Sequence, residues 1–91
     1  MPDHAEAKVT IVNRLGLHAR PAMTFVDLAV QFHSEVRVRK GEHEVDGKSI
    51  MQMMMLAAGK GSELVLCAEG PDAVKAIAAL RALIESGFDE E

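Results

Sequence analysis

The segment EVRVRKGEHEVD, residues 35–46, restricts the fold of this chain more than any other part of the sequence. Val36 and Val38 alternate with Arg37 and Arg39, which is typical of a strand with one buried and one wet face. Gly41 follows at the place of a hairpin turn, and HEVD can pair back as the next strand. An antiparallel hairpin in the middle of the chain excludes a purely parallel sheet, so we expect an α+β fold.

Strand-like and helix-like patterns flank this hairpin on both sides. Residues 19–32 carry apolar side chains at three- and four-residue intervals, with Pro21 in the first turn, where its missing N–H breaks no helical bond. Ser49 is a good cap for a short helix, and the near-continuous apolar run ELVLCAE predicts an interior strand. The predicted elements are strands at 8–13, 35–40, 43–46 and 63–69, and helices at 19–32, 49–57 and 71–86.

The predicted order is therefore β-α-β-β-α-β-α. The simplest packing places all three helices on one face of a four-stranded sheet. Because the chain has 91 residues, we expect a single domain over residues 1–91. The ends, about residues 1–4 and the acidic FDEE at 88–91, are expected to fray.

Composition excludes several classes of function. The net charge of −4 and the absence of Trp and Tyr give no basic, aromatic surface for nucleic acid. The N-terminal MPDHAEAK has no apolar signal segment, and no apolar run approaches the roughly 18 residues of a membrane span. Cys67 has no cysteine partner and is interpreted as a small buried hydrophobic residue. We expect a cytoplasmic protein with no membrane insertion and no nucleic-acid partner.

The stretch RLGLHARPAM, residues 14–23, places His18 at or next to a helix start. Backbone N–H groups there lack helical partners and the helix dipole is positive, which favours a bound anion. Arg20 stands in the first turn although the dipole opposes a cation there by about 0.3–1 kcal/mol, which indicates an anion that binds later. A neutral imidazole can accept a phosphoryl group. The residues alone leave an ordinary surface histidine as the other interpretation.

Ser49 follows the stretch GEHEVDGK, whose spacing departs from a Walker phosphate loop because Glu42 stands where the first glycine is required. Helix capping is the simplest role for this serine, and a cap serine is also a place where added phosphate is tolerated. The helix that follows is too short to bury all its apolar side chains. Ile50, Met51 and Met54 share one face by spacing and are expected to be exposed to partners.

GLHARPA, followed some thirty residues later by GKSIMQMMMLAA and GSELVL, closely resembles the HPr family of histidine-containing phosphocarriers of the phosphoenolpyruvate-dependent phosphotransferase system. The resemblance runs from about residue 5 to 86. It implies an open-faced β-sandwich of four antiparallel strands with three helices on one face. It also implies a stoichiometric phosphoryl carrier that is not an enzyme, and for which we expect no cofactor and a monomeric state.

The same resemblance implies roles for individual residues. His18 would accept a phosphoryl group on Nδ1 from phosphorylated enzyme I and pass it to enzyme IIA domains, with Arg20 stabilising the phosphate. Ser49 matches the regulatory serine that an ATP-dependent HPr kinase/phosphorylase modifies in many members. The docking surface implied for all partners consists of Ala19, Ile50, Met51 and Met54.

Other interpretations stay open beside this one. The stretch VDGKSIMQMMMLAAGKG looks like the nitrogen-related, regulatory branch of the family, whereas Pro21 belongs to the sugar-system motif HARPA. Gln52 stands where many relatives carry glycine. A mainly regulatory protein switched at Ser49 is the second hypothesis, and a small-molecule or nucleic-acid-binding α+β domain is the third, on fold-level analogy alone. His33 and His43 flank the hairpin without further ligands, so we expect no metal site.

Overall fold

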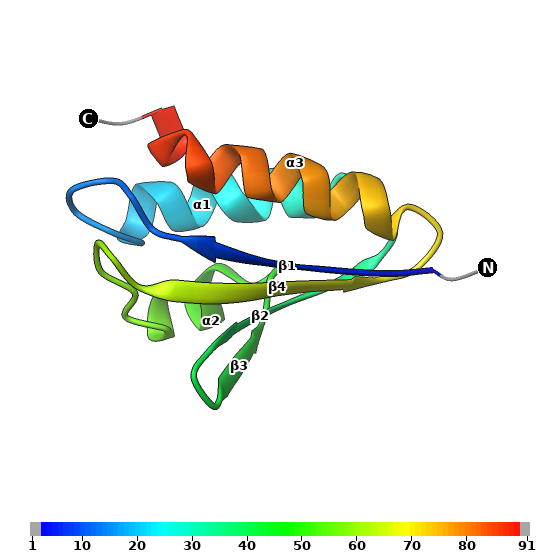
Figure 1. Ribbon diagram of the computed structural model, residues 1–91, viewed down its shortest axis with the longest axis horizontal. Helices are drawn as coiled ribbons and strands as arrows, with labels where there is room; N and C mark the ends of the chain where they lie inside the picture. The colour runs from blue at the N-terminus through cyan, green and yellow to red at the C-terminus, as the bar shows by residue number, and fades with distance from the viewer. Residues whose placement is uncertain (1–2, 90–91) are drawn as a thin grey trace.

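The computed structural model describes residues 3–89 and contains one four-stranded antiparallel sheet in the order β1-β4-β2-β3 (Figure 1). Both the predicted α+β order, β-α-β-β-α-β-α, and the interior position of the fourth strand are confirmed. The elements are β1 (His4–Thr10), α1 (Ala19–Ala29), β2 (Glu35–Lys40), β3 (His43–Asp46), α2 (Ile50–Met55), β4 (Glu63–Glu69), α3 (Ala73–Glu85) and a 3₁₀ turn (Gly87–Asp89).

The sheet buries one face and leaves the other open, as predicted. Side chains along each strand point alternately to the two faces of a sheet. In β2, Val36 and Val38 are fully buried while Arg37 is exposed, and β4 alternates in the same way around Leu64 and Leu66. The helices cover the buried face, where α1 and α3 lie side by side (Figure 1). The largest fully buried side chains include Phe25, Ile11, Met53, Leu64, Leu66, Leu80 and Ile84.

The first strand lies nearer the N-terminus than its sequence pattern indicates. We predicted residues 8–13, but β1 begins at His4, which pairs with Glu69, and ends at Thr10. Alanine and glutamate in HAEA are poor strand formers, so only pairing along the whole of β4 makes this segment extended. Ile11 lies beyond the strand but still exchanges backbone hydrogen bonds with residues 61 and 62, at 2.8 and 2.9 Å.

Two helices end earlier than the apolar spacing predicts. After Ala29, the N–H groups of Gln31 and Phe32 donate to carbonyls three residues back, so α1 tightens and stops before Phe32. α2 ends at Met55, and Ala57 adopts a left-handed φ of 51° that no helix can continue. Periodicity reports which side chains face the core, and it continues past the last helical residue because the following turn also packs inward.

The structure places two residues of the ends that we expect to fray, His4 and Phe88, within the fold. His4 belongs to β1, and Phe88 is only 5% exposed because its ring joins the hydrophobic core. Gly87, with a φ of 74°, turns the chain so that this ring folds back. The remaining part of that prediction, at residues 1–2 and 90–91, lies outside the described residues.

Candidate functional site

The loop before α1 is held against the segment that follows α2. The N–H of Leu17 donates to the carbonyl of Ala58 at 2.8 Å, and the Leu17 side chain is buried. Gly16 has a φ of 69°, and a Cβ atom there would lie 2.5 Å from the Ala58 oxygen and 2.7 Å from Cα of Gly59. Only glycine permits this close approach of two backbones. The residue before His18 is therefore fixed by tertiary contacts rather than by the helix.

His18 is the N-cap residue of α1, as predicted. Its backbone is extended, with φ −82° and ψ −170°, and its carbonyl accepts the N–H of Ala22 at 3.0 Å. Its own N–H donates to the carbonyl of Gly16 at 3.0 Å. In the described part of the chain, the half-buried imidazole is not used to cap the helix. The helix start therefore requires the backbone of this residue and not its side-chain chemistry.

The first turn of α1 presents a cation and no acid. Ala19 and Arg20 are both exposed there, while the next two residues, Pro21 and Ala22, are buried and anchor the turn to the core. The sequence of this turn, ARPA, contains no carboxylate to offset the positive end of the helix dipole. The guanidinium, the imidazole and the helix end together are suited to an anion such as a phosphoryl group.

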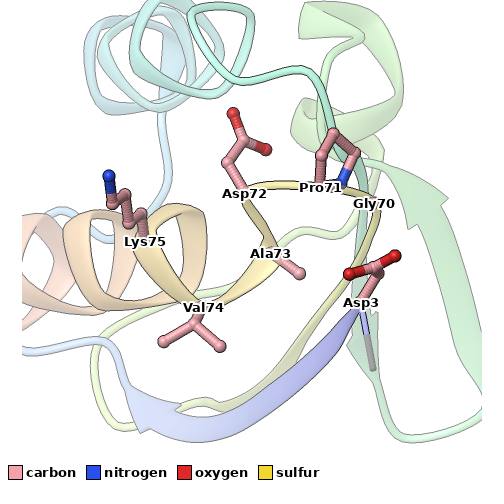
Figure 2. Close-up of a pocket in the computed structure, with 7 residues that line it drawn as sticks. All are labelled: Asp3, Gly70, Pro71, Asp72, Ala73, Val74 and Lys75. Atoms are coloured by element: carbon pink, nitrogen blue, oxygen red, sulfur yellow. The ribbon is translucent and has the colours of Figure 1, made fainter. Parts of the chain in front are cut away.

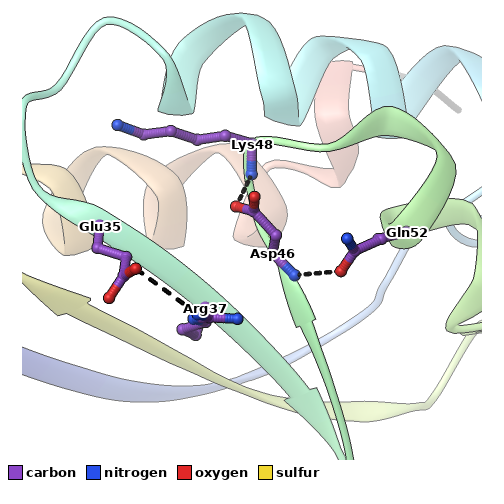
Figure 3. A network of polar contacts seen from close by, with 5 residues as sticks. All are labelled: Glu35, Arg37, Asp46, Lys48 and Gln52. Carbon is purple, nitrogen blue, oxygen red and sulfur yellow. Dashed lines mark hydrogen bonds and ion pairs between the residues drawn. The ribbon is translucent and has the colours of Figure 1, made fainter.

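Ser49 caps α2, as predicted, and binds Gln52, whose contacts with Asp46 and those of Asp46 with Lys48 are drawn in Figure 3. Its Oγ accepts the N–H of Gln52 at 3.2 Å, while Gln52 Oε1 accepts the N–H of Asp46 at 2.9 Å. The carboxylate of Asp46 in turn accepts the N–H of Lys48 at 2.9 Å. We did not predict this role for Gln52. Its S-x-x-Q spacing is that of a capping box, but the reciprocal bond differs, since Gln52 accepts the N–H of Asp46 while the N–H of Ser49 donates to the Asp46 carbonyl at 3.1 Å.

The exposed face of α2 has the composition that the spacing predicts. Ile50, Met51 and Met54 are 38, 78 and 45% exposed, whereas Met53 is fully buried. Met55 is 65% exposed and extends this face beyond the predicted residues. Successive helix residues are 100° apart, which places Met53 opposite the other three methionines. α2 therefore offers an apolar, flexible surface to solvent.

The structure brings His18 close to one end of α2 and Ser49 to the other. The Leu17–Ala58 hydrogen bond joins the start of α1 to the end of α2, and both loops lie at the same end of the sheet (Figure 1). Lys40 Nζ donates to the carbonyls of Leu56 and Ala57 at 3.4 and 3.1 Å and fixes that end. Six helical residues span only about 9 Å, so both predicted sites border one surface.

Cys67 does not lie in the core, where we expected it. It lies half-buried on the open face of the sheet, because β4 points its neighbours Leu66 and Ala68 to the helices. Its Sγ lies 3.2 Å from a carboxylate oxygen of Glu6. Partial burial and this carboxylate raise the pKa of the Cys67 thiol to about 11. The thiol is therefore protonated at neutral pH and has little nucleophilic character.

A hollow at the start of α3, at the opposite end of the sheet, is lined by Asp3 and residues 70–75 (Figure 2). The carboxylate of Asp72 points out of this hollow to the segment that follows α1. There it accepts the Ser34 hydroxyl at 2.6 Å and the N–H groups of His33 and Ser34 at 2.9 Å each. The Ser34 hydroxyl first, and then the His33 N–H, lower the pKa of Asp72 to about 2. Its charged group is thus used within the fold.

Two kinds of feature are absent from residues 3–89. No helix in this range is long and apolar enough to cross a membrane. Nor does the described chain bring three or more His, Cys, Asp or Glu side chains into a group that could hold a metal ion.

The matches to known proteins include both His18 and Ser49. The family described as "PTS HPr component phosphorylation site" matches residues 5–86. The phosphocarrier protein HPr of Pseudomonas aeruginosa is 54% identical over 84 residues, which are 91% of this chain and 93% of that protein. The phosphocarrier protein NPr of Proteus mirabilis is 47% identical over 85 residues, 92% and 94% of the two chains.

Solved structures agree with the fold. HPr-C-His from Thermoanaerobacter tengcongensis has a TM-score of 0.92 and 47% identity, and the match covers 96% of this chain and 98% of that one. A phosphocarrier protein HPr from Bacillus anthracis has a TM-score of 0.86 and 40% identity, with 89 and 96% covered. The sequence, the architecture and the helix start around His18 agree, and the chain belongs to the HPr family of phosphocarrier proteins of the phosphotransferase system.

Proposed function

We propose that His18 accepts a phosphoryl group from phosphorylated enzyme I and passes it to enzyme IIA domains. The observation that carries this proposal is the position of His18 at the start of α1, next to Arg20, in a chain matched by the HPr phosphorylation-site family. The protein then acts as a stoichiometric carrier in the cytoplasm and not as an enzyme, since it is itself modified and must be discharged.

The chemistry follows from the groups at the helix start. A neutral imidazole attacks phosphorus through Nδ1, and the bond from phosphorus to the donor breaks as the N–P bond forms. The new negative charge lies beside the helix end, where the dipole favours it, and within reach of the guanidinium of Arg20. A second attack by a group on the acceptor reverses these bond changes and restores the imidazole.

Partners are proposed to dock on the surface that surrounds this histidine. Ala19 in the first turn of α1 and the side chains of Ile50, Met51 and Met54 on α2 are exposed, and α2 packs against α1, which supports this proposal. Methionine side chains are unbranched and polarisable, so one such surface can adapt to donor and acceptor in turn.

Incubation with phosphoenolpyruvate and enzyme I tests the proposal directly. We expect one acid-labile phosphoryl group per chain, seen by intact mass, and its loss in His18→Ala. The matched control is His43→Ala, which removes an exposed histidine on β3 and should leave labelling intact. Arg20→Gln should slow labelling about tenfold, equivalent to about 1.4 kcal/mol of transition-state stabilisation. Labelling that survives His18→Ala would contradict the proposal.

Ser49 supports a second, regulatory function. A phosphate added there by an ATP-dependent HPr kinase/phosphorylase would bring about −1.5 to −2 charges next to Ile50 and Met51. Such a charge repels a partner that docks through apolar contacts and attracts one that presents arginines. The helix dipole and the capping position of Ser49 favour the added charge, so the fold itself should tolerate it.

Ser49→Asp separates this function from the carrier role. Aspartate is also a good N-cap, so the free energy of unfolding should change by less than about 0.5 kcal/mol. We expect altered affinity for enzyme I or for an enzyme IIA domain by isothermal titration calorimetry. Unchanged affinity for every partner would argue against regulation at Ser49 and leave the carrier role standing.

A further inference from the structure

The exposed methionines among residues 3–89 lie on the neighbouring helices α1 and α2. The sequence contains six methionines, and Met23, Met51, Met54 and Met55 are 49, 78, 45 and 65% exposed. We refer to these four side chains as the methionine patch. Met23 stands three and four residues after Arg20 and Ala19, so it shares their face of α1. Because α1 packs against α2, the patch borders the helix start that carries His18.

A buried methionine, Met53, can be compared with the exposed methionines of the patch. Met53 lies in the same run, MQMMM, but points to the core and is fully buried. A thioether needs direct contact with an oxidant, so its rate of oxidation follows its exposure. Four sulfur atoms at the docking surface are therefore open to oxidants, while one chemically identical sulfur a residue away is protected.

The single cysteine does not compete for this chemistry. Cys67 lies on the open face of the sheet beside Glu6, whereas the patch lies on the helices. Oxidants and electrophiles react with the thiolate, and a pKa of about 11 keeps this thiol protonated at neutral pH.

We propose that the methionine patch is a reversible oxidation site through which peroxides weaken partner docking. Each thioether forms one S–O bond as the O–O bond of a peroxide breaks. With hydrogen peroxide the second oxygen leaves as water, and sulfur loses the two electrons that the peroxide gains. The sulfoxide is polar where the thioether was apolar, which disfavours burial of this surface under a partner. The effect on docking rests on the proposed carrier function, whereas the site of oxidation does not.

Peptide mass mapping after exposure of the intact protein to hydrogen peroxide tests the site itself. We expect addition of one oxygen atom first at Met51 and Met55, then at Met23 and Met54, with Met53 at least tenfold slower. Circular dichroism on the same samples checks that the fold is retained. Equal rates at Met53 and Met51 in folded protein, or oxidation at Cys67 before the patch, would overturn the proposal. This measurement requires no partner, so it stands even if phosphoryl transfer fails.

The kinetics of labelling by enzyme I then test whether oxidation weakens partner docking. After catalase has removed the peroxide, we expect the concentration of oxidised protein that gives half-maximal labelling by enzyme I to rise about tenfold. The maximal rate should be unchanged. Methionine sulfoxide reductases for both epimers, supplied with a dithiol, should restore the original value, since the dithiol is oxidised to a disulfide as the sulfoxide oxygen leaves as water. A variant with leucine at all four patch positions should label after peroxide at its own untreated rate. Equal kinetics of the oxidised and reduced proteins, or a defect that persists after reduction, would overturn the effect on docking.

Discussion

The helices α1 and α3 begin at opposite ends of the sheet and in opposite chemical settings (Figure 1). At α3 the N-cap residue is Asp72, whose carboxylate points away from the hollow in Figure 2 and accepts hydrogen bonds from Ser34 and from the backbone of His33. At α1 the N-cap residue is His18, the first turn carries Arg20, and no acid stands in that turn. At the start of α3 the charged side chain is bound by another segment of the chain, whereas the first turn of α1 presents the exposed cation Arg20.

This difference separates a structural role from a functional one at the same kind of position. Charged side chains at a helix start stabilise a fold when the chain supplies their partners, as at Asp72. A histidine is a weak cap and an arginine opposes the dipole, so neither helix capping nor the dipole explains their presence at α1. The start of α2 lies between these cases, since the half-buried Ser49 caps the helix and is also a candidate for modification.

The largest expected effect comes from replacing His18 by a better cap. His18→Asn should abolish labelling by enzyme I and phosphoenolpyruvate, because the acceptor nitrogen is gone. The same change should raise the free energy of unfolding by about 0.5–1 kcal/mol, since asparagine caps helices well. Urea unfolding measures the second quantity. A destabilised variant would show that the imidazole serves the fold and would remove the contrast with Asp72.

Gly16 tests whether the loop, rather than the helix, positions His18. Gly16→Ala should lower the free energy of unfolding by about 3 kcal/mol, because it adds a close contact with the Ala58 oxygen to a left-handed backbone. Gly41→Ala is the matched control. It has a similar φ of 63° but open space around it, and should cost about 1–2 kcal/mol. Equal losses by thermal unfolding would mean that the contact with residues 58–59 is unimportant.

The cap of α2 should contribute a smaller amount. Ser49→Ala should lower the free energy of unfolding by about 1 kcal/mol, because the N–H of Gln52 loses its acceptor. Gln52→Ala should cost about 0.5–1 kcal/mol through loss of the bond from Asp46. Since the two bonds belong to one network, the double variant should lose less than the two single variants together, as a double-mutant cycle in urea would measure. Strict additivity would contradict a coupling between these two bonds.

The smallest expected effect is a pH dependence of the free energy of unfolding, which arises from Asp72 at the start of α3. The pKa of Asp72 is about 2 in the folded protein against 3.8 ordinarily, so the folded state favours the charged form. Its stabilisation is complete above about pH 3.8 and is lost as pH falls through about 2. We therefore expect wild type and Asp72→Asn to differ in stability at pH 5 and to converge near pH 2. Parallel stability curves across this range would show that the bonds to Ser34 do not depend on charge.

Much of the fold could be predicted from local patterns, and the misplaced elements share a cause. The hairpin at 35–46, the helix start at His18 and the cap at Ser49 depend on residues that are close in sequence, so their spacing was sufficient. The segment from His4 is extended only because β4 pairs with it, and Phe88 is buried only because the core accepts its ring. Propensity could not reveal either, because both depend on residues far away along the chain.

The sequence by itself determined the order of elements, the family, and the residues proposed to carry phosphate. Local rules of capping, periodicity and charge at a helix end act within a few residues, and a motif such as GLHARPA contains them all. Only the tertiary structure decided that the Ala58–Gly59 backbone holds the loop before His18, that Asp72 is satisfied by a segment 38 residues earlier, and that Cys67 faces away from the core. Each of these depends on which distant backbones and side chains meet when the sheet closes under its helices, and the spacing of residues along the chain does not contain that information.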